Sequence, residues 1–144
     1  MSNVKYSPEE LICAIATALA PAALGLVRCS GNACVELASK VFSRPDALVS
    51  SAGNSLVYGW LLKDGVKIDE VMAAVYRSPK SFTGEDMVEF SCHGGPGVVL
   101  AVQNLLLENG FRQAEKGEFS FRAFINGKMD LTRTEAVKEI IESR

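Results

Sequence analysis

The sequence predicts an α+β fold, in which helices pack on a mixed β-sheet. Short apolar and β-prone runs, bounded by turn residues, recur in the first two thirds of the chain, as expected for the strands of such a sheet. Two other segments repeat apolar residues every three to four positions, which is typical of helices that bury one face. The chain has 144 residues, of which 48% are hydrophobic, so it can bury a core without disulfide bonds.

Two strands and a helix are expected at the beginning of the chain. Residues 11–17 and 24–30 are almost continuous apolar runs, so we expect both faces of these two strands to be covered. Residues 11–27 carry no charge, but they follow two glutamates and are few for a membrane span. A helix is predicted to follow, with Ser30 as its N-cap. Its apolar face would consist of Cys34, Leu37, Ala38, Val41 and Phe42.

A loop, a hairpin and a further strand are expected in the middle of the chain. Residues 43–54 are rich in turn-forming residues and are predicted to form a surface loop. Residues 55–79 hold two β-prone runs on either side of Asp64-Gly65. This dipeptide strongly favours a hairpin, because both of its residues tolerate positive φ. The next strand is predicted at residues 86–92.

Two helices are expected in the last part of the chain. The first begins at Pro96, a residue suited to the first helical position, and runs to Asn109. Its inward side chains would be Val98, Val102, Leu105 and Leu106. Residues 111–130 are predicted to be irregular. A T-x-x-E capping box from Thr132 to Glu135 then predicts a last helix. Because the chain stops while the apolar pattern of this helix still runs, we expect it to begin a separate domain of a longer protein.

The charge balance and the cysteines argue against several classes of protein. The chain carries 15 basic and 17 acidic side chains, a net charge of −2, whereas a module that holds nucleic acid by its phosphates is expected to be basic. Its four cysteines include no C-x-x-C pair, and it has one histidine, so no metal site is expected. We therefore predict reduced, buried cysteines in a cytoplasmic protein.

The segment "SFTGEDMVEFSCHGGPG", residues 81–97, holds the histidine, three carboxylates and a glycine-rich turn. Adjacent side chains on a strand point to opposite faces, so Cys92 and His93 are not expected to form a nucleophile and its base. His93 is instead predicted to be a turn residue that satisfies backbone groups. The glycines that follow could hold an anion at a helix N-terminus. Since they lack the order G-x-G-x-x-G, we favour a tight turn from strand to helix.

Several charged residues stand at positions that need an explanation. Glu85 and Asp86 fit a solvated edge of the sheet. Glu89 lies between apolar neighbours on a strand, where a carboxylate is costly without a donor, so it forms either a structural salt bridge or a contact with the donors of a ligand. Arg28 raises the same question on an apolar strand. Lys128 follows an Asn-Gly turn and is expected on an exposed loop.

Three blocks of the sequence resemble one protein family. The blocks are "LGLVRCSG", "SFTGEDMVEFSCHGGPG" and "KGEFSFRAFINGKMDLTRTEAV", and the chain resembles the N-terminal part of the MnmE (TrmE) family from Ile12 onward. The family consists of multidomain GTPases that modify the wobble uridine of certain tRNAs together with the flavoprotein MnmG. The resemblance implies a cytoplasmic homodimer without membrane contact. It also implies contact with tRNA through the full complex rather than through this domain alone.

The resemblance also implies a domain organisation and a cofactor. Residues 1–118 correspond to a folate-binding and dimerisation domain similar to the folate-binding domain of aminomethyltransferases, and residues 119–144 to the beginning of a helical domain. The cofactor is a reduced one-carbon folate, 5-formyl- or methylene-tetrahydrofolate. The family's folate contacts fall on Arg28, Glu89 and Lys128. A carboxylate can accept the paired N–H groups of a pterin edge, so we assign Glu89 to the ring and the two basic residues to anionic or carbonyl groups.

The chain also departs from the family. Where relatives carry a glycine-rich segment with an arginine, "PPGRGG", residues 18–23 read "ALAPAA", which removes a cation from any anion contact of this loop. No G-x-x-x-x-G-K-S/T motif occurs, so GTP, magnesium and potassium are expected only in a domain that this chain lacks, and no catalytic residue is expected here. The alternatives are an assembly domain with a degenerate folate pocket and a freestanding aminomethyltransferase-like protein.

Overall fold

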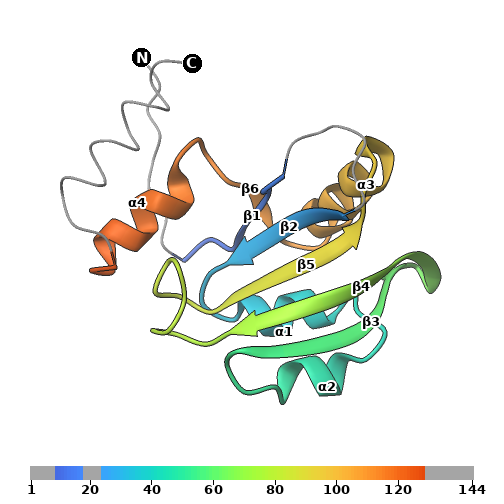
Figure 1. Cartoon of the computed structure of the whole chain (residues 1–144), viewed down its shortest axis with the longest axis horizontal. Helices are drawn as coiled ribbons and strands as arrows, with labels where there is room; N and C mark the ends of the chain where they lie inside the picture. Colours follow the sequence, from blue (N-terminus) through green and yellow to red (C-terminus); the bar gives the residue numbers. More distant parts are fainter. Residues whose placement is uncertain (1–8, 18–23, 129–144) are drawn as a thin grey trace.

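The protein contains a mixed sheet with helices packed on it, so the predicted α+β class is confirmed. The structure is a computed structural model that describes residues 9–17 and 24–128. Within these residues, the strands of one six-stranded sheet lie in the order β3-β4-β5-β2-β1-β6 (Figure 1). Neighbouring strands are antiparallel except β1 and β6, which run parallel. The likeness to the folate-binding domain of aminomethyltransferases stays a prediction.

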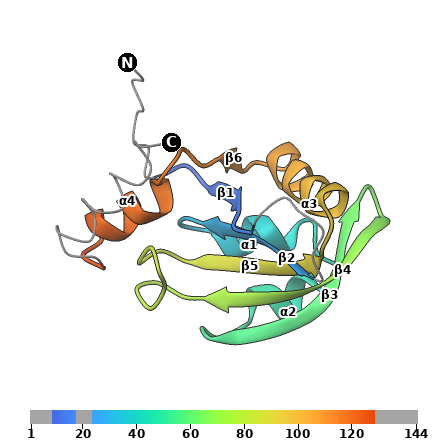
Figure 2. The ribbon, with the colours of Figure 1, turned by 45° about the horizontal axis from the view of Figure 1, so that its top comes forward.

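The two strands predicted near the beginning of the chain are confirmed as β1 (Ile12–Ile15) and β2 (Leu24–Ser30). β2 pairs with β1 on one side and with β5 (Met87–His93) on the other, so it lies inside the sheet. The prediction that both faces of β2 are covered is wrong. Its side chains alternate between buried and accessible, and Leu24 is 63% exposed, because the helices packed on β2 lie on one face of the sheet (Figure 2).

The helix predicted after β2 is confirmed, but Ser30 is not its N-cap. The helix α1 (Cys34–Ser39) begins after Ala33, which has a φ of 66°. Ser30 is the last residue of β2, and its hydroxyl lies 2.7 Å from Thr83 Oγ1 and donates to Glu85 Oε1 over 2.8 Å. The hydroxyl therefore fixes a distant loop instead of capping a helix.

The segment predicted as a surface loop, residues 43–54, contains a short helix, α2 (Pro45–Val49). Proline suits the first helical position, because its φ is already helical and its missing N–H would have no partner there. Leu48 is fully buried, which anchors this turn-rich segment on the core. The prediction of irregular structure is therefore wrong for the middle of the segment.

The predicted hairpin is confirmed as β3 (Ser55–Lys63) and β4 (Val66–Tyr76), and the strand after it as β5. Asp64 and Gly65 have φ values of 50° and 80°, the positive values for which this dipeptide is suited. β3 forms one edge of the sheet and pairs only with β4 among the described strands. Local sequence was thus sufficient to locate this turn.

The long predicted helix is confirmed as α3 (Pro96–Glu108). Val99, Val102, Leu105 and Leu106 are buried on it, whereas Val98, which was predicted to point inward, is only partly buried. The segment after α3, predicted to be irregular, contains two elements, β6 (Arg112–Gln113) and α4 (Glu118–Ile125). β6 exists through its pairing with β1, and α4 is held by ion pairs with distant residues.

Some predictions fall outside the described residues. These are the loop at residues 18–23 and the helix expected from Thr132 onward. The domain boundary after residue 118 stays a prediction. None of the helices within residues 9–17 and 24–128 is long and apolar enough to cross a membrane.

The hydrophobic core lies between the sheet and the helices α1, α2 and α3 (Figures 1 and 2). Cys13, Cys29, Cys34 and Cys92 are all free and buried, as predicted. The opposite face of the sheet carries Leu56, Tyr58 and Met72, which are 69%, 46% and 38% exposed. Strand pairing places Arg28 and Glu89 on this same face, beside Ala74 and Ser91. We call this surface the open face.

Candidate functional site

Two of the three predicted site residues, Arg28 and Glu89, form an ion pair on the open face. They stand opposite each other on β2 and β5, and Arg28 Nη2 donates to Glu89 Oε2 over 2.9 Å. Their side chains are 27% and 17% exposed. Arg28 Nε is buried and has no hydrogen-bond partner among the described residues. The salt bridge that the sequence left open as an explanation is therefore present, and the pair keeps one buried N–H for a further acceptor.

Tyr76 on β4 adds a hydroxyl group to this pair. Its oxygen lies 3.4 Å from Glu89 Oε1, which is long for a hydrogen bond between two oxygens. Burial, followed by the charge of Glu89, raises the pKa of Tyr76, so the hydroxyl keeps its proton. Because Glu89 Oε1 is only weakly held, it can accept hydrogen bonds from a ligand.

The guanidinium group of Arg28 also lies over two aromatic rings. Its Cζ atom is 5.6 Å from the ring centroid of Phe82 and 5.6 Å from that of Phe119, within the range of cation–π attraction. Phe82 belongs to the loop between β4 and β5, and Phe119 to α4. Sequence analysis missed both residues, since nothing in the spacing of either aromatic residue indicates contact with an arginine on β2.

The third predicted site residue, Lys128, lies at the border of this region. It is exposed, as predicted for its loop, and its backbone N–H donates to the carbonyl of Ala123 over 2.7 Å. A Cβ atom built on Gly84 would lie 3.3 Å from Lys128 Cγ, so Lys128 packs beside the loop that carries Phe82. No contact within the described residues joins its ammonium group to Arg28 or Glu89.

Glu85 and Asp86 are not solvated, contrary to the prediction. Glu85 has 14% of its side chain exposed and accepts hydrogen bonds from Ser30 and Arg122. Asp86 accepts from the backbone N–H of Ser78 over 2.7 Å and from Arg77 Nη1 over 3.4 Å. Both carboxylates therefore fasten the loop between β4 and β5, Asp86 through nearby residues and Glu85 through partners far away in the sequence.

Arg122 is a fully buried cation that joins α4 to the rest of the domain. Its Nη1 lies 3.1 Å from Glu85 Oε1 and its Nη2 lies 3.1 Å from Glu118 Oε2, with side-chain exposures of 0%, 14% and 4% in that order. Nη2 also donates to the carbonyl of Glu10 over 2.9 Å. A buried arginine is costly unless it is paired, so these contacts hold α4 in one place.

Glu118, the first residue of α4, is shared between two arginines. Arg112 Nη2 lies 2.7 Å from Glu118 Oε2, and the backbone N–H of Glu115 donates to Glu118 Oε1 over 2.9 Å. Burial would raise the pKa of Glu118, but the hydrogen bonds from Arg112 and Glu115 outweigh it and lower this pKa. The carboxylate therefore stays charged and keeps both arginines in position.

Cys92 is buried and His93 is exposed, as expected for adjacent side chains of a strand, which point to opposite faces. Burial raises the pKa of Cys92 to about 11, so its thiol stays protonated at neutral pH. His93 is exposed at the end of β5, and its Nδ1 lies 2.7 Å from Asp69 Oδ1. The prediction that His93 is a turn residue is wrong, because it ends the strand and its backbone N–H donates to Asp69 over 2.8 Å. The glycines after it turn the chain into α3, as expected.

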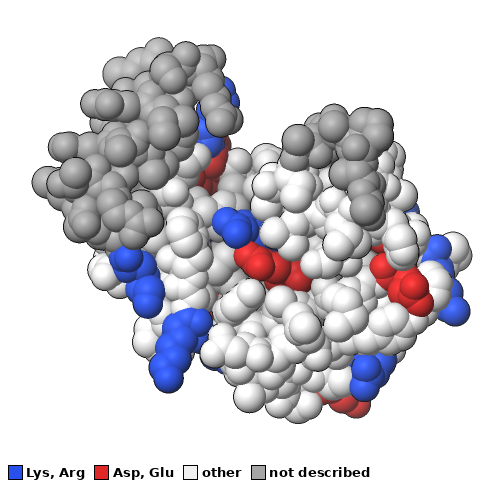
Figure 3. All heavy atoms as spheres, in the orientation of Figure 1, with Lys and Arg blue, Asp and Glu red and all other residues white. Residues whose placement is uncertain are grey.

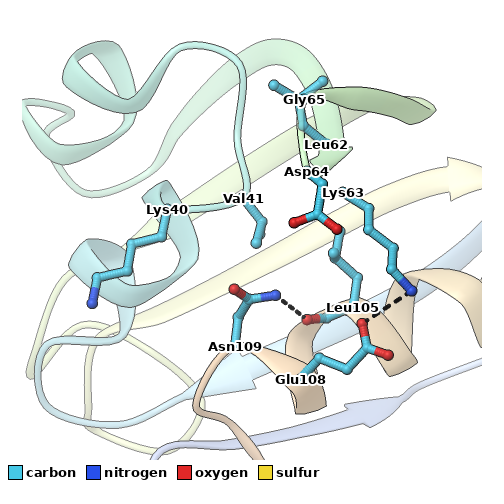
Figure 4. A pocket seen from close by; sticks show the side chains of 9 residues that line it. All are labelled: Lys40, Val41, Leu62, Lys63, Asp64, Gly65, Leu105, Glu108 and Asn109. Atoms are coloured by element: carbon cyan, nitrogen blue, oxygen red, sulfur yellow. Dashed lines mark hydrogen bonds and ion pairs between the residues drawn. The ribbon is translucent and has the colours of Figure 1, made fainter.

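A separate pocket of about 400 Å³ lies at the tip of the β3–β4 hairpin, beside the end of α3. Figure 4 shows Lys63 reaching toward Glu108, with which it forms a 3.4 Å ion pair, while Lys40 points away. Both members of this pair are about half exposed. None of the predicted site residues lines the pocket, and its mixed charges indicate no particular ligand.

Charged side chains lie at more than one place on the open face, since Glu70 also lies there and accepts a hydrogen bond from Tyr58. Figure 3 shows this face mostly uncharged, with basic and acidic side chains adjoining near its middle. The described residues contain no group of three or more histidine, cysteine, aspartate or glutamate side chains able to hold a metal ion. A carboxylate, a buried N–H and two aromatic rings thus meet at one place on an apolar surface, which makes this place the candidate site.

Comparison with known proteins gives consistent matches. Residues 11–128 match the family described as "GTP-binding protein TrmE N-terminus". The chain is 61% identical over 142 residues to the tRNA modification GTPase MnmE of Treponema denticola, which covers 97% of this chain and 30% of that protein. It is 49% identical over 140 residues to the tRNA modification GTPase MnmE of Treponema pallidum, covering 97% of this chain and 28% of that protein.

A relative from another genus gives a similar match. The tRNA modification GTPase MnmE of Chlorobaculum tepidum is 47% identical over 140 residues, which covers 95% of this chain and 30% of that protein. The chain thus spans less than a third of the length of these relatives. Because the family match covers most of the chain and both predicted strand residues of the site, the chain belongs to the family of the GTP-binding protein TrmE N-terminus.

Proposed function

We propose that this chain is the cofactor-binding module of a tRNA modification GTPase and that it binds a reduced one-carbon folate on the open face. The observation that carries the proposal is the Arg28–Glu89 ion pair, which lies in an apolar surface and leaves Arg28 Nε buried without a partner. A buried donor without a partner costs free energy. A ligand that offers an acceptor to this N–H would remove that cost.

The chemistry of a folate fits these groups. The edge of the pterin ring offers adjacent N–H donors, and Glu89 Oε1, held only by the long contact with Tyr76, has lone pairs for them. A pterin carbonyl or ring nitrogen can accept from Arg28. Lys128, exposed at the border of the region, suits the carboxylates of the glutamyl tail.

The wider function follows from family membership and is part of the same proposal. The relatives carry the name tRNA modification GTPase, so we propose that the bound one-carbon unit serves the modification of the wobble uridine. The chain would act as a homodimer, with the flavoprotein MnmG as partner, in the cytoplasm where tRNA is found. GTP hydrolysis, with its magnesium and potassium, would belong to another part of the protein, and tRNA would be bound by the full complex.

A second candidate is an assembly domain that has lost the cofactor. The replacement of a glycine-rich segment by "ALAPAA" at residues 18–23 favours it. Arg28 and Glu89 also neutralise each other's charge, so the pair does not need a ligand for this purpose. The first candidate explains the unpaired Arg28 Nε, which the second does not. A freestanding aminomethyltransferase-like protein is less well supported, since the described site offers no catalytic acid beside an amine site.

Calorimetric titration with 5-formyl-tetrahydrofolate tests the proposal. We expect the wild-type chain to bind and Glu89→Gln to bind about ten- to a hundredfold more weakly, because a charged acceptor is lost. Glu36→Gln, a matched change on the exposed side of α1, should leave the affinity unchanged. A wild-type chain that binds no folate would support the assembly domain, and equal affinities of all three proteins would disprove the role of Glu89.

A further inference from the structure

The position of the Arg28 guanidinium is only partly fixed by the sheet. An arginine has five N–H donors in a planar fork at the end of a flexible side chain. Glu89 accepts from one of the two terminal nitrogens of Arg28, and Nε has no partner within the described residues. The ion pair alone therefore leaves the guanidinium plane free to turn about the Nη2 contact.

The two aromatic rings supply the missing restraint. A guanidinium stacks on aromatic faces, and such a contact fixes the plane as well as the place of the charge. Phe82 and Phe119 both lie 5.6 Å from Arg28 Cζ. They come from two segments outside the sheet, the β4–β5 loop and α4, which are separated from Arg28 by more than fifty residues along the chain.

Each ring is carried by a segment that is itself held firmly. Thr83, next to Phe82, is fully buried, and its Oγ1 lies 2.7 Å from the hydroxyl of Ser30. The side chain of Asn126, at the end of α4, donates to the carbonyl of Thr83 over 2.9 Å. Together with the Arg122–Glu85 ion pair, this contact locks α4 to the loop, so both rings keep their places beside Arg28.

The two rings lie outside the hydrophobic core of the sheet. Phe82 is 44% exposed, and Phe119 is only partly buried. The contact that both rings share is the one with the guanidinium of Arg28, which an aromatic ring attracts and a leucine does not.

We propose that Phe82 and Phe119 are positioning residues that set the Arg28 guanidinium for the folate, which makes the docking of α4 part of the binding site. The inference rests on the proposed folate-binding function. Because ligand and α4 both act on Arg28, their effects are linked, and linkage is reciprocal. Folate bound at Arg28 should therefore also stabilise α4 against the sheet.

Folate titrations of ring variants of the chain test this proposal. We expect Phe119→Leu to weaken the binding of 5-formyl-tetrahydrofolate about three- to thirtyfold, the range of one cation–π contact. Phe119→Tyr, which keeps a ring, should restore the wild-type affinity. In an Arg28→Gln background, Phe119→Leu should cause no additional loss, because a residue that acts through Arg28 has nothing left to act on.

A second variant and a spectroscopic signal guard against misfolding. Phe82→Leu changes an exposed loop residue and should weaken binding in the same way without affecting the thermal unfolding of the chain. The NMR signal of the Arg28 Nε–H, identified by its loss in Arg28→Lys, should move in Phe119→Leu, because ring currents act on it. An unmoved signal, or an effect of Phe119→Leu that persists fully without Arg28, would overturn the proposal.

The titrations also separate this inference from the proposed function. A wild-type chain that binds no folate refutes the function and the inference together. A wild-type chain that binds folate, with both leucine variants binding equally well, refutes the inference alone. Weaker binding in Phe119→Leu that tyrosine does not restore would mean that the residue has a purely structural role.

Discussion

The positive charge of Arg122 is buried and inaccessible to solvent. Its side chain is fully buried, and Glu85 and Glu118 face it with 14% and 4% of their side chains exposed. Such an arrangement is stable only while both signs of charge are present, because a carboxylate left alone in the interior pays the whole cost of desolvation. We therefore expect Arg122 to stabilise the fold rather than to contact a ligand.

Replacement of Arg122 should strongly destabilise the domain. We expect Arg122→Met to lower the free energy of unfolding by about 3–5 kcal/mol, because two buried carboxylates lose a partner. Urea denaturation followed by circular dichroism measures the change. Arg44→Met is the matched control, since Arg44 is exposed and, among the residues that the structure describes, donates only to the carbonyl of Tyr58. It should cost about 0.5 kcal/mol or less. Similar losses in the two variants would contradict this account.

The lowered pKa of Glu118 predicts how stability depends on pH. Its pKa in the folded state lies below the ordinary value of 4.5, so the folded protein binds its proton less readily than the unfolded chain. The stabilisation by Glu118 is therefore complete above pH 4.5 and is lost as the pH falls through the lowered folded pKa. Urea denaturation of wild type and Glu118→Gln should show a difference that is constant near neutral pH and shrinks in acid.

A matched change elsewhere controls for general acid effects. Glu36→Gln on the exposed side of α1 should differ from the wild-type protein by the same small amount at every pH. If the difference between wild type and Glu118→Gln stays constant down to pH 3, Glu118 is not held as a charged partner of Arg112 and Arg122.

At the level of single residues, sequence reasoning found the charges that stand out from an apolar strand. Arg28 and Glu89 could be singled out because a charge in such a run needs a partner. Phe82, Phe119 and Arg122 could not, since an aromatic residue or an arginine in a polar segment is unremarkable until the fold brings its partner close. The same reason explains why Glu85 was wrongly expected in solvent.

At the level of elements, the predictions succeeded where the signal is local. The hairpin turn at Asp64-Gly65 and the helix from Pro96 to Glu108 are determined by residues that are neighbours in the sequence. β6 and α4 were missed because each is stabilised from outside, β6 by the edge of β1 and α4 by buried ion pairs. α2 was missed because one buried leucine decides the conformation of a segment with the composition of a loop.

Two glycines offer a test of how strongly local conformation stabilises these elements. Gly65 in the β3–β4 turn has a φ of 80°, and no atom lies within 4 Å of a Cβ built there. We expect Gly65→Ala to lower the free energy of unfolding by about 1 kcal/mol through backbone strain alone. Gly97, in the first turn of α3, has equally free surroundings and no positive φ.

Gly97→Ala should therefore raise the free energy of unfolding, whereas Gly65→Ala should lower it. Alanine reduces the entropy of the unfolded chain and favours the helix, so stability should rise by about 0.5–1 kcal/mol. Thermal unfolding of the two variants beside the wild-type protein provides the measurement. A stabilised Gly65→Ala would show that the hairpin turn has relaxed to negative φ.

At the level of the whole molecule, the helices that form the core lie on one side of the sheet and the apolar open face lies on the other. Exposed apolar groups side by side are a feature of surfaces that bind partners. Under the proposed function the partner is a second copy of the chain. The exposed Leu56 and Met72 on this face are then expected to lose their contact with water on dimerisation.

A pair of leucine variants tests this expectation. Leu56→Glu puts a charge on the open face, and Leu100→Glu puts the same charge on α3, on the other side of the sheet, where Leu100 is 41% exposed. Light scattering after size-exclusion chromatography should give the mass of a dimer for wild type and Leu100→Glu, and that of a monomer for Leu56→Glu. A monomeric wild-type chain, or a dimeric Leu56→Glu, would rule out this interface.

The four buried thiols make the protein a reporter of its own opening. Alkylating reagents attack the thiolate, and burial raises the pKa of Cys13 to about 12 and that of Cys92 to about 11. Iodoacetamide can therefore label these side chains only during the moments when the surrounding structure separates. Since Cys13 lies on β1, near one margin of the sheet, and Cys92 on β5, in its interior, their relative labelling rates tell which part comes apart first.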